Sequence, residues 1–582
     1  MKVSDAIIKF LADKGVRNVF LLTGGAICHV TDSLNNDSRI KYICCHHESA
    51  LSMATEAYSR IKEDIGVLIV TSGPGGSNSL TGVLSAFVDS IPMLVISGQC
   101  GTNQLIGNTG ERQVGVQEAD IISIVKPITK YAKLVLDKDM VLWHLDMVYK
   151  IAKDGRQGPV WLDIPVDIQA QQIDYEERIA DIEKTGFYKI PTRIECDDDQ
   201  IEWVAESLIN AKRPILQVGH GVRLAKCLPR MHELINQIGC AVQTTWGAVD
   251  YLDDSDKRYA GHPGTWGQRW ANMATQQADF ILCLGTRLSS PQTGYNLESW
   301  GKNATKFVVD IDTHVLNRVQ KFGCNVVWSS MDYFIDNLLE KIKGISLNYD
   351  SWLDTVQTLK AKYPVVMAEY YQEQLNSYVF LDRLSEMCDN NYVITSDVGT
   401  SFAGMFPVWK VKIGQRLINQ SGLFAMGHAL PSAIGSWFAD SSKKQLCLCG
   451  DGGFQMNIQE LQTIKHYNIP VKIFVFCNDG YLTIKHTEMN HFGRLTAVNA
   501  ETGLSMPNFS KVAKAYGIKG YHIYNYKDME KWLPVILNSN EPILCSVHTD
   551  PMQPIVPKLG AKLVDGKFLN VEFDDLVPYL ER

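Results

Sequence analysis

Residues 446–457 read LCLCGDGGFQMN: an apolar run typical of a buried strand ends in Gly450-Asp451-Gly452-Gly453. Glycines let the backbone turn tightly after a strand and let a bulky anion approach it. A carboxylate at the carboxyl end of a parallel strand lies where open α/β sheets bind their ligands. A bare Asp451 would repel a diphosphate, and a bound Mg²⁺ removes that conflict because hard cations bind carboxylate and phosphate oxygens together. Taken alone, the four residues also fit an ordinary glycine turn.

The next predicted strand, VKIFVFCN (471–478), ends at Asn478, 27 positions after Asp451. A helical stretch, NIQELQTIKHYN (457–468), fills the interval. A right-handed strand-helix-strand crossover of this length brings the ends of both strands side by side. Asp451 and Asn478 are therefore predicted to hold one metal ion, with the carbonyl oxygen of Gly480 as a third protein ligand. This phasing disfavours the plain glycine turn.

Length and pattern indicate an α/β protein of three domains, each a mostly parallel sheet covered by helices. At about 100–200 residues per domain, the 582 residues favour three domains. Short β-rich runs alternate with helical stretches, which is typical of parallel sheets. We assign residues 1–175 to the first domain, 190–345 to the central domain, 365–550 to the third domain and 551–582 to a C-terminal cover segment. The stretches 173–200 and 347–352 are interpreted as linkers.

The expected strands are short apolar runs with many β-branched residues. Residues 1–16 have the pattern of an amphipathic helix, and further helices are expected at 49–61 and 77–89. The first and third domains show a similar layout of these elements. The expected strands span 16–22, 67–72, 93–97, 214–219, 280–285, 306–312, 392–397, 445–451 and 471–478.

The bulk composition disfavours several classes of protein. The net charge is −8 and no basic stripe occurs, so neither nucleic acid nor an anionic membrane is expected as a partner. We find no signal peptide and no apolar run of about 18 residues, so we expect a cytoplasmic protein without a membrane span. The 14 cysteines form no paired CxxC framework and are expected to be buried free thiols.

GDG followed at this distance by Asn resembles the thiamine-diphosphate motif of the acetolactate synthase and pyruvate oxidase group of enzymes. The resemblance covers nearly the whole chain. It implies a pyrimidine-binding first domain, a central domain and a diphosphate-binding third domain. It also implies thiamine diphosphate and Mg²⁺ as cofactors. The family forms homodimers or homotetramers, in which the first domain of one subunit and the third domain of its neighbour share each active site.

The resemblance also assigns catalytic residues. In KYICCHHESA (41–50), Glu48 matches the family's acid that hydrogen-bonds the pyrimidine ring. Gln117, in RQVGVQEAD, matches an active-site glutamine that orients cofactor and substrate. His29, His47 and His486 are candidates for acid–base groups or for hydrogen-bond donors to the acceptor. A structural role is the alternative for each histidine, and compensation of a helix dipole is the alternative for Glu48.

Several segments resemble those that hold thiamine diphosphate in the family. Gly399, Thr400 and Ser401 are expected to hold the diphosphate. Met426 is expected to wedge between the two rings of the cofactor, a role that suits an apolar and adaptable side chain. The full set of expected contacts is Gly25, Gly73, Pro74, Gly75, Gly399, Thr400, Ser401, Gly422, Phe424, Met426, Gly450, Gly452, Gly453 and Tyr481.

In this family the central domain holds FAD in a non-redox role, or holds nothing. The features here that resemble a flavin site are Gly219, Gly221, Thr245, Arg287 and Asp310. Arg287 suits the recognition of a diphosphate. Glycines after a strand also serve simply to turn the chain, so both alternatives stay open at this point.

The acceptor side departs from the pattern of true synthases. Val116 stands where they usually carry Phe, and Val166 stands where they usually carry Lys. Thr483, Lys485 and His486 follow the metal site where a Trp is usual. The combination of LTGGAICH, HHE and GYLTI looks more like a branch found in deoxysugar pathways. Enzymes of that branch transfer a two-carbon unit from pyruvate to a keto-sugar nucleotide.

The sequence therefore predicts thiamine-diphosphate-dependent decarboxylation of a 2-oxo acid, with pyruvate as the first choice, and transfer of the two-carbon unit to a carbonyl acceptor. One alternative is a simple 2-oxo-acid decarboxylase that releases the aldehyde. Another is a non-catalytic fold relative that acts as a binding subunit. An NAD-dependent dehydrogenase is disfavoured because the stretch after Gly219-His220-Gly221 lacks the last glycine of the dinucleotide fingerprint.

Overall fold

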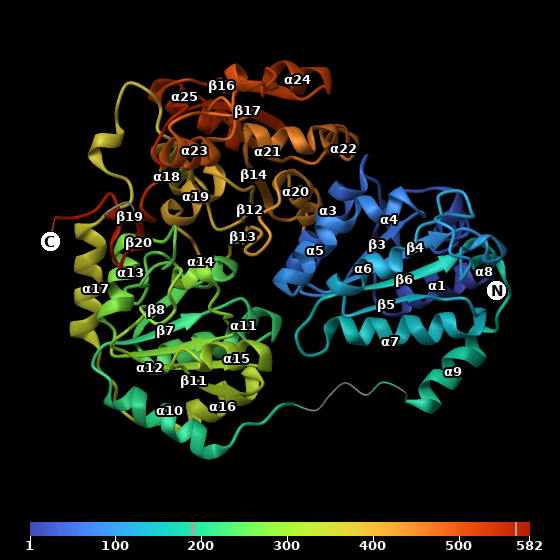
Figure 1. The fold of residues 1–582 in the computed structure, drawn as a ribbon, viewed down its shortest axis with the longest axis horizontal. Coiled ribbons are helices and arrows are strands. Elements are labelled where there is room, and N and C mark those ends of the chain that lie inside the picture. Colours follow the sequence, from blue (N-terminus) through green and yellow to red (C-terminus); the bar gives the residue numbers. More distant parts are fainter. Residues whose placement is uncertain (187, 189–192, 565–566, 582) are drawn as a thin grey trace.

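Three parallel sheets, each covered by helices, make up the protein (Figure 1). The computed structural model describes residues 1–186, 188, 193–564 and 567–581. Every strand pair within the three sheets is parallel. This architecture confirms the predicted fold class. Among the described residues, no helix is both long and apolar enough to cross a bilayer.

The first sheet consists of β1 (Asn18–Leu21), β2 (Lys41–Ile43), β3 (Gly66–Val70), β4 (Met93–Gln99), β5 (Tyr131–Leu134) and β6 (Pro159–Pro165), in the spatial order β2-β1-β3-β4-β6-β5. Every residue of β3, β4 and β6 is buried, as expected for a parallel sheet with helices on its faces. The helices are α1 (Val3–Asp13), α2 (Cys28–Ser33), α3 (Glu48–Lys62), α4 (Pro74–Asn78), α5 (Leu80–Asp89), α6 (Ile121–Val125), α7 (Val141–Lys153), α8 (Val166–Ala170) and α9 (Tyr175–Thr185).

The third sheet repeats this strand order. Its strands are β12 (Tyr392–Ser396), β13 (Arg416–Ile418), β14 (Lys444–Gly450), β15 (Lys472–Cys477), β16 (Lys519–Ile523) and β17 (Ile543–His548), arranged as β13-β12-β14-β15-β17-β16. Gly450 pairs with Phe476, so the residues that follow β14 and β15 emerge at the same edge. The helices are α18 (Ser377–Met387), α19 (Thr400–Val408), α20 (Ala429–Ala439), α21 (Asp451–Met456), α22 (Leu461–His466), α23 (Leu482–Phe492), α24 (Phe509–Ala515) and α25 (Tyr526–Leu537).

The central sheet has five strands, β7 (Pro214–Val218), β8 (Ala241–Thr244), β9 (Phe280–Leu284), β10 (Thr305–Asp310) and β11 (Asn325–Trp328), in the order β11-β10-β9-β7-β8. Its strands and helices enclose a hydrophobic core of their own. The helices are α10 (Asp198–Asn210), α11 (Gly221–Leu224), α12 (Leu228–Ile238), α13 (Arg269–Gln277), α14 (Ser290–Thr293), α15 (Thr313–Gln320), α16 (Met331–Lys341) and α17 (Asp350–Lys362).

Both stretches interpreted as linkers contain helix, so that interpretation was wrong. Within 173–200, α9 begins after Asp174, whose side chain accepts a hydrogen bond from the Glu177 amide at 3.1 Å. The acidic residues that suggested a solvated linker instead occupy the first turn, where they complement the helix dipole. Ile179 and Ile182 pack against the core of the first domain. The predicted start of the central domain, residue 190, lies outside the described residues.

The second supposed linker, 347–352, leads directly into α17. Tyr349 and Trp352 are buried in the central core. Trp352 Nε1 donates to the Pro214 carbonyl at 3.1 Å. The polar residues of this stretch suggested a linker, whereas its two aromatic side chains attach α17 to the central domain.

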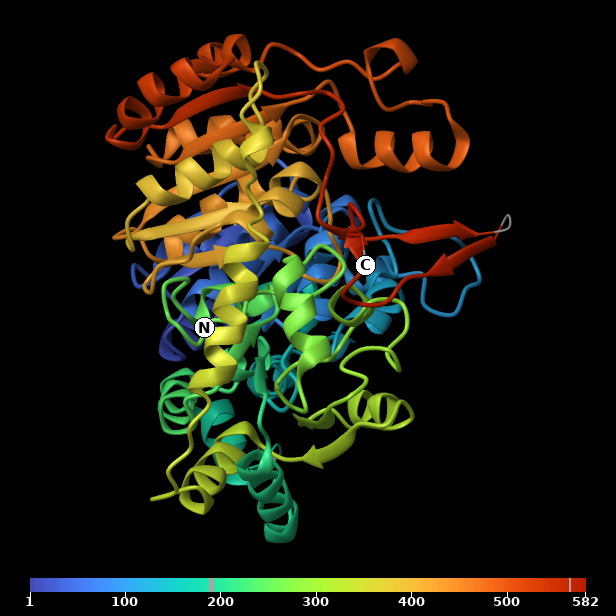
Figure 2. The same ribbon diagram turned by 90° about the vertical axis from the view of Figure 1, so that its left-hand side faces the viewer.

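The C-terminal segment docks on the central domain. β18 (Lys558–Leu559) pairs with β21 (Leu576–Val577), while β19 (Ala561–Val564) and β20 (Lys567–Asn570) form an antiparallel ribbon that projects from the body (Figure 2). From α13, Arg269 donates to the Leu576 carbonyl at 2.9 Å and Asn272 to the Phe573 carbonyl at 2.8 Å. Residues 565–566 and 582 of the predicted cover segment lie outside the described residues.

Helices α3 and α20 join the first and third domains. Leu51 and Ala54 of α3 belong to the same buried apolar cluster as Ala433 and Ile434 of α20. The helix backbones approach so closely that a Cβ atom on Gly435 would run into the carbonyl oxygen of Ala54. Glycine at this position therefore allows the two domains to share one core.

Replacing Gly435 with Ala is expected to destabilise the protein by about 1–3 kcal/mol, because the added methyl group forces the two helices apart. Urea unfolding of both proteins measures the difference. The control is Ser436→Ala in the same helix, since the Ser436 hydroxyl is buried without a hydrogen-bond partner among the described residues. A Gly435→Ala variant as stable as this control would show that the helices are not in tight contact.

Candidate active site

The carboxylate of Asp451 lies where two strand ends of the third sheet meet. Asp451 directly follows β14, begins α21 and is 2% exposed. Its two oxygens accept hydrogen bonds from the backbone amides of Gly452 at 2.7 Å, Asn478 at 3.1 Å and Gly480 at 3.0 Å. The loop after β15 therefore wraps around this carboxylate. The structure brings together the three residues predicted to hold the metal.

The side chain of Asn478 carries a buried oxygen without a partner. Its Nδ2 donates to Thr400 Oγ1 at 3.1 Å, whereas its Oδ1 has no hydrogen-bond partner among the described residues. Burial raises the pKa of Asp451 to about 6, and the backbone donors oppose that shift. A divalent ion beside these two side chains would satisfy the amide oxygen and neutralise the carboxylate. The donor set therefore fits Mg²⁺.

Residues 478–480, which we call the metal loop, also require glycine at the last of these positions. Gly480 has φ +105°, and a Cβ atom there would run into the carbonyl oxygen of Val498. Among the described residues, no cluster of three His, Cys, Asp or Glu side chains could hold a metal ion. A site with one carboxylate and an amide is consistent with Mg²⁺, which usually keeps phosphate and water oxygens among its ligands.

Lys485 and His486 face the C-terminal segment within their own subunit. Lys485 is 1% exposed, and its Nζ donates to the Asn478 carbonyl at 2.9 Å and to the Pro551 carbonyl at 3.3 Å. His486 Nε2 lies 2.8 Å from the Gln553 carbonyl. Lys485 thus stabilises the metal loop through the Asn478 carbonyl. Both side chains form hydrogen bonds with backbone carbonyls.

Asp397 was not identified from the sequence. It ends the strand run before the segment that carries Gly399, Thr400 and Ser401, and it is 2% exposed. Burial raises its pKa to about 6. Its carboxylate accepts hydrogen bonds from the amides of Val398 at 2.8 Å and Gly427 at 3.0 Å. The sequence pattern that could have identified Asp397 is an acid at the end of an apolar strand, shortly before a glycine. The same pattern identified Asp451.

The expected diphosphate segment opens α19. Gly399 has φ +73° and is the N-cap residue of that helix. Thr400 Oγ1 accepts the hydrogen bond from Asn478, and Ser401 Oγ donates to the Val398 carbonyl at 3.0 Å. The positive end of α19 and the metal loop therefore lie next to one another, an arrangement that favours an anion.

Two glycines after β14 allow close contacts with the surrounding segments. A Cβ atom on Gly452 would run into the ring of Tyr481 and would lie 3.4 Å from Met426 Cε. A Cβ atom on Gly453 would lie 2.8 Å from Asp397 Oδ2. The expected contacts Gly452, Tyr481 and Met426 therefore gather at one place.

The acid of the first domain has a specific partner. Glu48 is the first residue of α3, and its Oε2 accepts a hydrogen bond from Asn78 Nδ2 at 3.0 Å. Asn78 ends α4, the short helix that contains Pro74 and Gly75, and the sequence did not single it out. Among the described residues, no hydrogen bond or ion pair joins Glu48 to Asp451 or Asn478.

Two of the predicted histidines, His29 and His47, lie at the helices α2 and α3 of the first domain. His47 caps α3, and its Nδ1 accepts the Ser49 amide at 3.1 Å. His29 lies in α2, one turn after Gly25, and is partly exposed. His47 is exposed as well, so both imidazoles have an edge open to solvent.

The loop that carries Gln117 is strained and tightly held. Gln117 has φ +59°, which is uncommon for a residue with a side chain and often marks a functional site. Its carbonyl oxygen lies against Gly73, also at φ +59°, where a Cβ atom would approach that oxygen at 2.7 Å. The neighbouring Glu118 accepts backbone amides from Ile106, Val114 at 2.9 Å and Gly115 at 3.1 Å.

A buried polar cluster supports the same loop from the sheet. Asp163 is 1% exposed and accepts Ser97 Oγ at 2.5 Å and Gln99 Nε2 at 3.0 Å. Gln99 Nε2 also donates to the Ala119 carbonyl at 3.0 Å, two residues beyond Gln117. Burial raises the pKa of Asp163 to about 7.

A cavity of about 660 Å³ lies between the central domain and the other two domains. Of the residues with flavin-site character, Gly221, Thr245, Arg287 and Asp310 line it. Gly219 lies just outside the lining, where a Cβ atom would run into the Gly285 carbonyl. These residues, far apart in the sequence, therefore converge on one site.

The cavity wall offers unpaired polar groups to a ligand, of which Trp246 Nε1 and Gln292 Nε2 are donors, whereas His220 Nε2 is an acceptor because Nδ1 donates to the Gly247 carbonyl at 3.0 Å. Buried nitrogens of His220, Trp246 and Gln292 have no hydrogen-bond partner among the described residues, and all three residues line the cavity. Burial lowers the pKa of Arg287, and the nearby charges of other arginines add to this effect. Burial raises the pKa of Asp310. The unpaired donors of Trp246 and Gln292, together with the Arg287 guanidinium, fit a ligand that carries phosphate groups.

Comparison with known proteins agrees with this geometry. Residues 1–124 match the family described as thiamine pyrophosphate enzyme, N-terminal TPP binding domain. Residues 201–333 match its central domain, and residues 397–547 match its C-terminal TPP binding domain. The fold and site thus define a thiamine-diphosphate enzyme.

Three relatives indicate which group of thiamine-diphosphate enzymes the chain belongs to. The chain is 30% identical to the acetolactate synthase large subunit of Cyanidium caldarium, over 94% of this chain and 93% of that protein. It is 29% identical to the probable acetolactate synthase large subunit of Methanocaldococcus jannaschii, over 99% and 98%. It is 29% identical to the acetolactate synthase isozyme 2 large subunit of Escherichia coli, over 95% and 96%. The chain belongs to the acetolactate synthase large-subunit family.

Asp163 predicts a pH dependence of stability. An Asp has a pKa near 3.9 when unfolded, whereas the native pKa is about 7, so the native state binds the proton more tightly. The resulting stabilisation is full below about pH 4 and is lost as the pH rises through 7. Relative to Asp163→Asn, the wild type is expected to lose about 3 kcal/mol between pH 5 and pH 8.

Urea unfolding of wild type and Asp163→Asn at both pH values measures this loss. The variant serves as the internal control, since its amide keeps the shape of the side chain and does not titrate in this range. Unfolding free energies that change in parallel for both proteins would mean that Asp163 is ionised in the native state throughout.

Proposed function

We propose that this protein is a thiamine-diphosphate-dependent carboligase that decarboxylates pyruvate and transfers the two-carbon unit to a carbonyl acceptor. The carrying observation is the convergence of Asp451 with the unpartnered amide oxygen of Asn478, in a chain that matches acetolactate synthase large subunits over nearly its full length. When bound, thiamine diphosphate supplies the carbanion centre and the electron sink that decarboxylation needs.

The third domain holds the charged end of the cofactor in this proposal. Asp451, Asn478 and the Gly480 carbonyl would bind Mg²⁺, which would offset the charge of the diphosphate. Gly399, Thr400 and the positive end of α19 would hold the same anion. The Mg²⁺ requirement is supported by the pKa of Asp451, which burial raises although Lys485 and three backbone amides oppose the shift. It is also supported by the buried Asn478 Oδ1, which has no hydrogen-bond partner among the described residues.

The same domain also supplies the apolar wall. Met426, beside Tyr481 and Gly452, would provide an adaptable apolar surface for the rings of the cofactor. Phe424 has φ +54° and packs edge-on against Trp246 and Phe402, with ring centroids 5.5 Å and 5.1 Å apart. This packing fixes the backbone just before Met426.

Glu48 acts in the proposal as the acid that hydrogen-bonds the pyrimidine ring, and Asn78 orients its carboxyl group. Gly25, Gly73, Pro74 and Gly75 shape the wall beside the ring. Gln117 is held rigidly by its loop and would orient cofactor and substrate, while His29 and His47 contact the acceptor. Rigid support of this kind lowers the entropic cost of bringing reacting groups together.

We also propose a homodimer or homotetramer with shared active sites. Within one subunit, no hydrogen bond or ion pair among the described residues joins Glu48 to Asp451 or Asn478. Val116, beside Gln117, is 87% exposed and Phe492, at the end of α23, is 70% exposed. A second subunit that covers these apolar side chains would bring a first domain to a third domain.

The acceptor is proposed to be a carbonyl compound, either a second 2-oxo acid or a keto-sugar nucleotide. The names of the full-length relatives favour carboligation over simple decarboxylation or a non-catalytic role. We place the protein in the cytoplasm, a proposal supported by the described cysteines, which are free thiols.

The test of the proposed function is the product formed from pyruvate. With Mg²⁺, thiamine diphosphate and a panel of acceptors (pyruvate, 2-oxobutanoate, keto-sugar nucleotides), we expect CO₂ release and a product heavier than the acceptor by a two-carbon unit, identified by mass spectrometry. Acetaldehyde as the sole product would instead establish the simple decarboxylase.

The variant that tests the role of Glu48 is Glu48→Gln, which keeps the size and the hydrogen bonding of the side chain but cannot exchange a proton. We expect turnover to fall by at least about 100-fold, in line with the loss of an acid–base group. Binding of thiamine diphosphate, followed by calorimetry, should change little. Full activity of this variant would remove Glu48 from the mechanism.

FAD is the proposed occupant of the central cavity, in a non-redox role. The purified protein is expected to bind FAD with the absorbance of a bound flavin after gel filtration. Arg287→Gln should weaken FAD binding by about 10–100-fold, because a charge-assisted hydrogen bond contributes roughly 1.5–3 kcal/mol. If wild type retains no flavin from a large excess of FAD, the cavity holds something else.

A further inference from the structure

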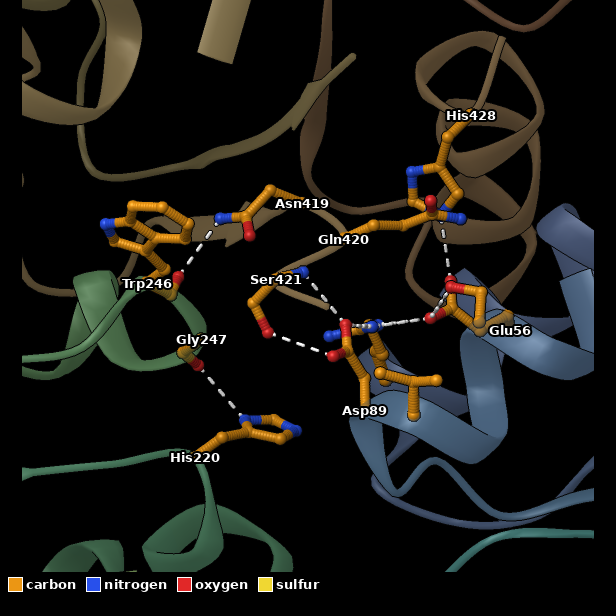
Figure 3. A network of polar contacts seen from close by, with 12 residues as sticks. Glu56, Asp89, His220, Trp246, Gly247, Asn419, Gln420, Ser421 and His428 are labelled. Carbon is orange, nitrogen blue, oxygen red and sulfur yellow. Dashed lines mark hydrogen bonds and ion pairs between the residues drawn. The ribbon is translucent and has the colours of Figure 1, made fainter. Parts of the chain in front are cut away.

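Asp89, the last residue of α5, contacts residues of all three domains, and Figure 3 shows its hydrogen bonds with Ser421. Its Oδ2 accepts the Ser421 amide at 2.9 Å and Arg60 Nη2 at 2.7 Å. Its Oδ1 accepts Ser421 Oγ at 3.0 Å and lies 3.5 Å from Arg287 Nη2. Arg60 belongs to the first domain, Arg287 to the central domain and Ser421 to the third, so this single carboxylate receives donors from each.

The loop that Asp89 holds leads to the active site. Residues 419–427 are fixed at one end by Asp89, and at the other end by Asp397, which accepts the Gly427 amide. A Cβ atom on Gly422 would run into Val88, so the loop is pressed against the end of α5. In sequence, Met426 lies between Ser421, which bonds Asp89, and Gly427, which bonds Asp397. The position of Asp89 therefore determines where this loop begins.

The loop also carries unsatisfied groups. Asn419 Oδ1 and Gln420 Nε2 are buried without a hydrogen-bond partner among the described residues. Asn419 Nδ2 donates to the Trp246 carbonyl at 3.1 Å, and Gln420 Oε1 accepts the Ala425 amide at 2.6 Å. Unpaired buried groups cost free energy, so the loop is not at its most stable without further partners.

The same loop borders the central cavity. Val88, Asp89, Arg287 and Ser421 all line it. Arg287 of the central domain contacts the end of α5 twice, because its Nη1 donates to the Val88 carbonyl at 2.9 Å while its Nη2 lies 3.5 Å from Asp89 Oδ1. A phosphate-bearing ligand that binds Arg287 in this orientation would hold the guanidinium against the end of α5.

We propose that Asp89 is a positioning residue that couples the central cavity to loop 419–427, so that a phosphate-bearing ligand in the cavity and thiamine diphosphate bind with positive cooperativity. A ligand that fixes Arg287 and Ser421 orders the loop in advance, and the second ligand then pays less ordering entropy. This inference rests on the proposed function for the identity of the two ligands.

The fold is expected to tolerate loss of the Asp89 charge. Arg60 also bonds Glu56 Oε1, at 2.8 Å through Nε and 2.5 Å through Nη2, and His428 Nε2 lies 2.9 Å from Glu56 Oε2. Burial would raise the pKa of Glu56, but Arg60 and His428 overcome it and lower the pKa to about 2. Arg60 therefore keeps a charged partner in Asp89→Asn.

The experiment is a binding cycle in the presence of Mg²⁺. Thiamine diphosphate is titrated by calorimetry into wild type with and without saturating FAD, and FAD is titrated with and without thiamine diphosphate. We expect each ligand to tighten the other by the same factor, at least about fivefold, since coupling is reciprocal. In Asp89→Asn we expect a factor below about two, with both ligands still bound.

The matched control is Asp332→Asn. Asp332 also lines the cavity, but its partner is Arg193, at 2.9 Å, and it makes no contact with loop 419–427. This variant should keep the wild-type coupling factor. Equal coupling in wild type and Asp89→Asn, or no coupling in wild type, would overturn the proposal.

Hydrogen exchange of residues 421–427 tests Asp89 without any ligand. We expect faster exchange in Asp89→Asn than in Asp332→Asn, and equal rates would contradict the positioning role. If wild type binds no FAD, the cooperative part of the inference fails together with the proposed flavin. If coupling is present but no product forms from pyruvate, the proposed function fails while the role of Asp89 stands.

Discussion

A buried negative charge at the meeting point of two strand ends is the constraint on which the third domain depends. An ionised carboxylate in a poorly polarisable interior is unfavourable unless it is paired and hydrogen-bonded. Three backbone amides donate to Asp451, yet burial still raises its pKa to about 6. The unpartnered oxygen of Asn478 adds a second unfavourable term beside it. A divalent cation, as proposed for this site, would relieve both unfavourable terms.

The features that were predicted from sequence are those determined by local pattern. An apolar run that ends in GDG, and a second run that ends in Asn, are sufficient to place Asp451 and Asn478 at one sheet edge, because a crossover of this length has a single common handedness. The strand runs at 67–72, 93–97 and 445–451 correspond to buried strands in the structure. Their apolar composition follows from burial on both faces.

The features that were missed depend on partners far away in the chain. Asn78 contacts Glu48 across 30 positions, and Gly427 contacts Asp397 across 30 positions. No periodicity predicts such pairs. Lys485 and His486 illustrate the same limit, since their residue types suggested an acceptor pocket, whereas their bonds to the carbonyls of Asn478 and Gln553 depend on where the C-terminal segment docks.

Large buried ion networks connect the domains, and their cost has a structural consequence. Arg223 and Arg416 both reach the carboxylate of Asp250, and Arg223 and Arg416 also lie 3.4 Å from Glu63 Oε1. Breaking one member of such a network would leave an uncompensated buried charge, which is strongly unfavourable. The relative orientation of the three domains is therefore fixed by charge pairing as well as by the core shared by α3 and α20 (Figure 1).

The repeated strand order of the first and third sheets is used for two chemically different tasks. In the proposed reaction, the third sheet anchors a polyanion and so concentrates positive charge around Asp451. A carboxyl group that must exchange a proton is better kept out of the field of a divalent cation, because that field favours the ionised form. Glu48 follows β2 at the rim of the first sheet and pairs with the neutral amide of Asn78. In the proposed assembly, the two carboxylates lie on separate sheets that meet only between subunits, so Asp451 would stay charged beside the metal ion while Glu48 would exchange a proton.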